Sequence, residues 1–164
     1  MNIQILIKED GELLEFDRSS FPFKIFQNEL GNYEELEGLL NFRSEEKLCP
    51  IESSSIVSDI FGAYNSINDF LEFEFASSPL NNETTVFKYE NFDEQKVKLE
   101  LDAAEWIVDK EAFFVAILNS SFAFFEALLK TEENDHYKMN LEVIKSLAIK
   151  LNLADRLKNL AHSR

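Results

Sequence analysis

The feature that most constrains the fold is the apolar segment between Lys110 and Lys130. Asp109 stands before it as an N-cap, and Glu111 suits the positive end of a helix as Lys130 suits the negative end. A helix over this segment would be apolar nearly all round, so other parts of the chain must cover most of its sides. We therefore predict a central buried helix whose core-filling residues are five phenylalanines: Phe113, Phe114, Phe122, Phe124 and Phe125.

A membrane span is a less favoured interpretation of the same segment. The run Ala112–Leu129 has sufficient length, but it contains polar residues, among them Asn119 and Glu126. The N-terminal apolar run Ile5–Ile7 is far too short for a signal peptide, and Cys49 alone gives no disulfide framework. We expect a cytoplasmic protein that does not bind membranes.

Alternating apolar residues predict strands in the first two thirds of the chain. Ile3, Ile5 and Ile7 share one face, and Asp10-Gly11 is a residue pair suited to a tight hairpin turn before Glu12–Phe16. Three later segments alternate in the same way and are predicted strands: Leu71–Phe75, Thr85–Tyr89 and Val97–Leu101. In the first of these, Leu71, Phe73 and Phe75 would point to the core and the two glutamates to solvent.

Helical spacing appears elsewhere. The serines before Ile56 offer a helix start, and the apolar residues Ile56, Ile60, Tyr64 and Ile67 follow at spacings of four, four and three. Ile25–Leu40 is ambiguous, with a short helix around Tyr33–Leu40 as one option. Two further helices are predicted near the C-terminus, one opening at Asn140 with Leu141, Ile144, Leu147, Ala148 and Leu151 inward, and a last short one with Leu153, Leu157 and Leu160.

These elements define an α+β fold class. An N-terminal β-hairpin and an antiparallel sheet of about five strands would pack against the central apolar helix and the C-terminal helices. We expect one domain over residues 1–164, with a sheet-rich part at 1–108 and a helical part at 109–164.

The charge of the chain is concentrated in its sheet-rich part. The net charge is −15, yet residues 130–164 hold seven bases and five acids, so residues 1–129 carry a net charge of −17. Such a field disfavours contact with phosphate backbones and opposes compaction by self-repulsion. The sequence therefore argues against a nucleic-acid partner and favours a basic protein partner.

Residues for catalysis or metal binding are scarce. His136 and His162 are 26 positions apart, and Cys49 has no neighbouring Cys or His, so no transition-metal site is predicted. The four glycines are isolated, no Gly-x-Ser-x-Gly turn exists, and the acid pairs are more typical of solvated surface residues than of glycosidase pairs. We predict no enzyme activity, no catalytic residue, no cofactor and no metal.

Several acidic clusters are candidates for binding a basic partner. Their convergence on one face would steer such a partner electrostatically, whereas the plain alternative is that they are solvated acids of an acidic protein. The candidate partner-binding residues are Glu34, Glu35, Glu37, Glu72, Glu74, Asp93 and Glu94.

In size, acidity and lack of catalytic motifs, the whole chain resembles the immunity proteins of bacterial polymorphic toxin and contact-dependent growth inhibition systems. That resemblance implies a protein that inhibits a nuclease-like toxin domain by covering its active site. The sequence leaves the oligomeric state open, with a monomer favoured. Two alternatives remain open. A secretion chaperone of the type III class is also small, acidic and Phe-rich but usually begins with a helix, and a DNA mimic should carry more continuous charge.

Overall fold

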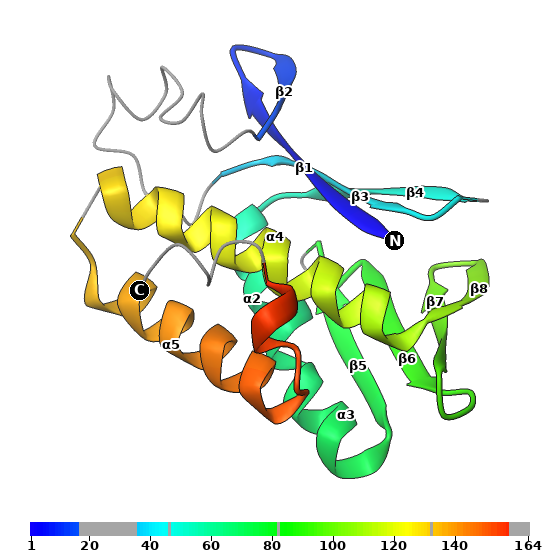
Figure 1. Ribbon diagram of the computed structural model, residues 1–164. Coiled ribbons are helices and arrows are strands. Elements are labelled where there is room, and N and C mark those ends of the chain that lie inside the picture. The colour runs from blue at the N-terminus through cyan, green and yellow to red at the C-terminus, as the bar shows by residue number, and fades with distance from the viewer. Residues whose placement is uncertain (17–35, 46, 82, 132, 158–164) are drawn as a thin grey trace.

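The computed structural model describes residues 1–16, 36–45, 47–81, 83–131 and 133–157, which form an α+β fold with two antiparallel four-stranded sheets (Figure 1). The first sheet has the strand order β2-β1-β3-β4 and the second the order β5-β6-β7-β8. The strands of the first sheet are β1 (Asn2–Glu9), β2 (Glu12–Glu15), β3 (Gly38–Arg43) and β4 (Leu48–Ser53). Those of the second are β5 (Phe75–Leu80), β6 (Thr85–Asn91), β7 (Lys96–Leu101) and β8 (Ala104–Asp109).

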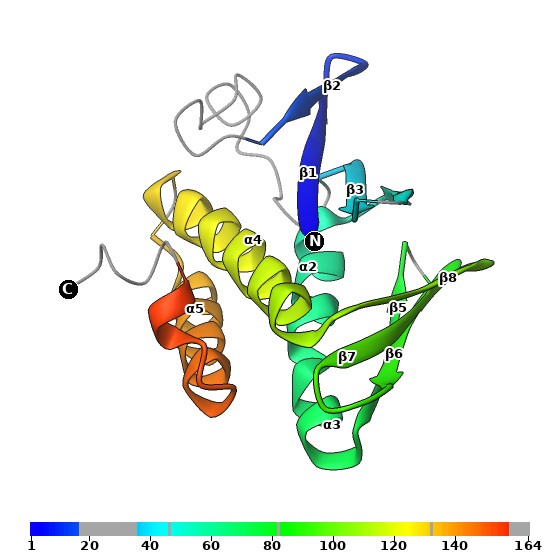
Figure 2. The ribbon, with the colours of Figure 1, turned by 45° about the vertical axis from the view of Figure 1, so that its right-hand side comes forward.

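The helices are α2 (Ile56–Asn65), α3 (Ile67–Phe73), α4 (Lys110–Thr131) and α5 (Asp135–Lys150), and a 3-10 turn, η2 (Ala154–Arg156), follows. The central position of α4 is confirmed: it contacts β1 of the first sheet, β7 and β8 of the second, and both α2 and α5 (Figures 1 and 2). Asp109 caps it, since its Oδ1 accepts from the Ala112 N–H at 2.7 Å. All five predicted phenylalanines are buried, and the one described helix long enough to cross a membrane is mostly buried inside the fold.

The predicted N-terminal hairpin is confirmed as β1 and β2. Asp10 and Gly11 both have positive φ, 51° and 84°, which is the geometry of the tight turn that matches the twist of two antiparallel strands. The short helix predicted around Tyr33–Leu40 is wrong over its last residues, because β3 begins at Gly38 and pairs with β1. The rest of that prediction lies outside the described residues.

The second sheet confirms the predicted strands at Thr85–Tyr89 and Val97–Leu101 as parts of β6 and β7. The strand predicted at Leu71–Phe75 is wrong, because residues up to Phe73 form α3 and only Phe75 enters β5. The helix buries Ile67 and Phe70, three positions apart, and this helical spacing prevails over the local alternation. Leu71, Phe73 and Phe75, which the alternation placed in the core, are exposed.

Eight strands, rather than about five, form the sheets of the described residues. Pro50 and Pro79 obscure β4 and β5 in the sequence, and both prolines stand on edge strands, where a missing N–H is tolerated. The predicted start of α2 is confirmed, with Ser55 Oγ accepting from the Ser58 N–H at 3.3 Å. Ile67, however, belongs to the separate helix α3.

The C-terminal helices differ in their boundaries. The first begins at Asp135 rather than at Asn140, since Asn134 is its N-cap and accepts from the His136 N–H at 2.8 Å. Asn140 lies buried within α5, where its Oδ1 accepts from the Tyr64 hydroxyl at 2.5 Å. The last predicted helix is only the short η2, flanked by the buried Leu153 and Leu157; Leu160 lies outside the described residues.

Candidate partner-binding surface

The structure brings four of the predicted acids to one end of the molecule. Glu72 and Glu74 lie where α3 passes into β5, while Asp93 and Glu94 form the turn between β6 and β7. Both views show these two segments together at the lower end of the fold (Figures 1 and 2). Glu37 lies elsewhere, beside the first sheet, and Glu34 and Glu35 fall outside the described residues.

Backbone hydrogen bonds hold the α3–β5 junction against the end of β6. Glu74 adopts a left-handed conformation (φ 57°, ψ 18°) that ends the helix, and its N–H donates to the Phe70 carbonyl at 2.8 Å. The Glu74 carbonyl then accepts from the Asn91 N–H at 2.9 Å, and the Asn91 side chain lies 3.5 Å from Glu74 Oε1. A pair of segments almost twenty residues apart in sequence is thereby fixed side by side.

The β6–β7 turn is organised by Asp93. Its Oδ1 accepts from the N–H groups of Gln95 and Lys96, both at 2.8 Å, which is an arrangement typical of an aspartate that shapes a turn. The Asp93 carbonyl accepts from Lys110 Nζ at 3.0 Å, so the turn is also tied to the start of α4. Glu94 is left exposed at the tip of the turn.

This end of the molecule carries excess negative charge. Residues 67–75 include three acids and no base, and residues 90–96 include three acids and one lysine. Within the described part of the chain, the four acids Glu72, Glu74, Asp93 and Glu94 make no ion pair. Their charges are therefore available to a partner.

Large apolar side chains are exposed among these acids, which the sequence reasoning missed. Leu71 is 41% exposed, Phe73 65%, Phe75 45% and Phe92 55%. The spacing of Ile67 and Phe70 could have indicated α3 in place of the predicted strand, but it does not by itself place Leu71, four residues after Ile67, outward. We call residues 71–75 and 92–94 together the acidic aromatic surface.

Two of its rings belong to residues beside the end of β6. Phe75 lies opposite Glu90 in the β5–β6 register, and Phe92 stands two residues beyond Glu90 on the same strand path. Glu90 thus stands across the sheet from Phe75 and two residues before Phe92, and its Oε1 lies 3.8 Å from Lys98 Nζ.

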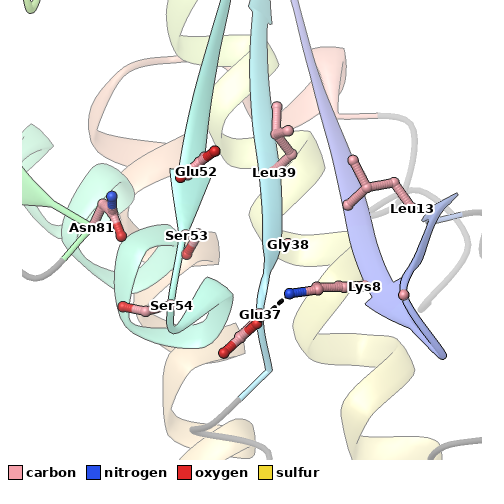
Figure 3. A pocket seen from close by; sticks show the side chains of 10 residues that line it. Lys8, Leu13, Glu37, Gly38, Leu39, Glu52, Ser53, Ser54 and Asn81 are labelled. Carbon is pink, nitrogen blue, oxygen red and sulfur yellow. Dashed lines mark hydrogen bonds and ion pairs between the residues drawn. The ribbon is translucent and has the colours of Figure 1, made fainter.

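Glu37 occupies a different environment. Its Oε2 lies 3.0 Å from Lys8 Nζ, at the rim of a shallow hollow of about 440 Å³ beside the first sheet (Figure 3). Ser53 and Asn81 also line this hollow, but Ser53 Oγ donates to Asp59 Oδ2 at 2.5 Å and the Asn81 N–H donates to Asp59 Oδ1 at 3.0 Å. These groups contact the interior, and Lys8 pairs with Glu37, so Glu52 alone adds unbalanced negative charge to the lining of the hollow.

The described residues give little support for a metal site or a catalytic site. No group of three or more His, Cys, Asp or Glu side chains in them is arranged to hold a metal ion. Burial, and secondarily the charge of Asp102, raises the pKa of the Cys49 thiol, which lowers its nucleophilicity at neutral pH. His136 lies exposed in the first turn of α5, and His162 is outside the described residues.

Comparisons of the chain with protein-family models, curated proteins and solved structures give no match.

Proposed function

We propose that this protein is a non-enzymatic, acidic binding protein of the cytoplasm that neutralises a basic protein partner. The partner that fits best is a toxin domain of nuclease type, whose active site would be covered by the acidic aromatic surface. The observation that carries the proposal is the convergence on one end of the fold of four exposed apolar side chains and four carboxylates that make no ion pair with any described residue.

The physical argument combines steering with burial. A nuclease lines its substrate cleft with Lys and Arg to hold phosphates, so an opposing field of carboxylates raises the rate of encounter and disfavours acidic competitors. Aromatic side chains then supply the apolar contact that slows dissociation, because buried aromatic anchors dominate the energy of protein interfaces. Glu72 and Phe73 are adjacent representatives of these two roles.

The test compares two double charge reversals. Glu72→Lys with Glu94→Lys changes the acidic aromatic surface, and Glu12→Lys with Glu15→Lys makes the same change in net charge on β2, at the opposite end of the molecule (Figure 1). All four side chains are exposed, so the fold should tolerate both variants. The partner is first captured from host lysate at low salt, identified after elution with high salt, and purified.

Calorimetry with the purified partner then gives the result. We expect a one-to-one complex whose affinity falls with salt and drops about tenfold or more in the first variant, a loss of ~1.4 kcal/mol, with little change in the second. Equal losses in both variants would show only non-specific charge attraction. A salt-tolerant complex of a homodimer with an unfolded segment would instead establish the chaperone alternative.

A further inference from the structure

The acidic aromatic surface alternates rings with carboxylates. In residues 71–75 the order is Leu, Glu, Phe, Glu, Phe, and in residues 92–94 it is Phe, Asp, Glu. Only four phenylalanines in the described ranges are among the exposed large hydrophobic residues, and three of them stand here, each next to a carboxylate in sequence. The fourth, Phe61 on α2, is flanked by Ile60 and Gly62.

This arrangement suits one kind of cation. A guanidinium group is planar, stacks on aromatic faces and forms paired hydrogen bonds with a carboxylate, and it loses its hydration more readily than an ammonium group. A lysine ammonium is a compact charge that gains mainly from the carboxylates. A surface of carboxylates alone would discriminate weakly between the two, whereas rings set between carboxylates favour arginine.

We infer that the acidic aromatic surface recognises arginine side chains of the partner in preference to lysine side chains. The inference rests on the binding role proposed above and specifies the chemistry of the partner's contact segment. Each guanidinium would lie over an exposed ring, Phe73 or Phe92, and pair with the neighbouring carboxylate of Glu72, Glu74 or Asp93.

A second copy of this chain fits the same surface poorly. Two such surfaces facing each other would bring Glu72, Glu74 and Glu94 against the same three residues of the other copy. Like charges that meet across an interface cost several kcal/mol. The charge thus selects a cationic occupant, although the rings alone would accept any apolar one.

The experiment uses the full-length protein with nona-arginine and nona-lysine peptides, which carry equal charge, at one fixed ionic strength. Dissociation constants are measured by fluorescence anisotropy. The test variant combines Phe73→Leu, Phe75→Leu and Phe92→Leu, which keeps exposed apolar side chains but removes all three rings of the surface. The control is Phe61→Leu, which removes an exposed ring that has no acidic neighbour in sequence.

We expect the wild type to prefer nona-arginine by about two- to fivefold for each engaged ring. The triple Phe→Leu variant should lose this preference and keep its affinity for nona-lysine, while Phe61→Leu should behave as the wild type. An arginine preference that survives in the triple variant would overturn the inference, as would equal affinity of the wild type for both peptides. If Glu72→Lys with Glu94→Lys still abolished binding of both peptides, the proposed acidic binding role would stand without the arginine preference.

Discussion

Glu74 occupies a position where glycine would be more stable. It follows the last residue of α3 with φ 57° and ψ 18°, and a side chain in this left-handed region costs roughly 1–2 kcal/mol because its β-carbon crowds the following carbonyl. Glycine has no such cost and is the residue most often found after the end of a helix. Glu74→Gly leaves the backbone hydrogen bonds to Phe70 and Asn91 in place.

The net effect is smaller than the strain alone. Glycine gives the unfolded chain more freedom, which offsets about 0.4–1 kcal/mol of the gain. The variant also removes the hydrogen bond from Asn91 Nδ2 to Glu74 Oε1, which is 3.5 Å long and exposed and so contributes little. We therefore expect Glu74→Gly to raise the free energy of unfolding by about 0.5–1 kcal/mol, which corresponds to a rise in Tm of about 1–4 °C for a chain of this length.

Urea and thermal denaturation followed by circular dichroism measure this change. The matched control is Glu72→Gly, which changes another exposed glutamate, one inside α3, and should lose about 1 kcal/mol because glycine is unfavourable within a helix. A Glu74→Gly variant with an unchanged or lower midpoint would refute the reasoning from strain. Under the proposed function, both variants should also bind the partner less tightly, so stability and affinity would change in opposite directions only at Glu74.

Three interior positions give further predictions. Burial raises the pKa of Asp59 above its ordinary value, so the free energy of unfolding of the wild type should fall as the pH rises from about 3.8 through the folded-state pKa. Asp59→Asn should remove this decline. Urea titrations of both proteins across pH measure it, and a constant difference in stability between them would contradict the prediction. Tyr64→Phe leaves the buried Asn140 Oδ1 without its donor and should cost about 1–3 kcal/mol by urea denaturation. Gly38→Ala would place a β-carbon 2.0 Å from the Leu6 carbonyl oxygen, so we expect ~1–3 kcal/mol of destabilisation, and an unchanged Tm would contradict the tight β1–β3 approach.

The sequence predicts those elements whose periodicity agrees with the final packing. The Ile3–Ile7 alternation and the Asp10-Gly11 turn are local signals that the tertiary structure does not oppose. The helix at Lys110–Thr131 is equally strong, since its apolar surface has no alternative to burial. The strand prediction at Leu71–Phe75 is wrong because an alternation over only five residues can also occur at the end of a helix. The buried residues of that helix, Ile67 and Phe70, come just before the alternation.

The candidate surface was predictable only in its acids. Sequence reasoning selected Glu72, Glu74, Asp93 and Glu94, but the distance between the two pairs depends on the hydrogen bond of Asn91 to Glu74, a long-range register that no local pattern encodes. The exposed rings were beyond reach for a related reason. Phe73 ends α3, so an error in that one element reversed its expected orientation, while Phe75 and Phe92 lie outside the helix.

Residues whose local preferences disagree with the structure around them mark positions that have a role other than folding. The acidic aromatic surface combines three of them: a glutamate in a conformation better suited to glycine, exposed phenylalanines in a chain that buries most of its described large apolar residues, and carboxylates that pair with no described cation. Each one lowers stability or solubility in isolation. A basic partner would cover the rings and neutralise the carboxylates together, and the strain at Glu74 would persist because its carboxylate is needed there. Glu74→Gly therefore distinguishes a role in binding from a role in folding alone. If the surface served folding alone, replacing Glu74 with glycine would cost no function.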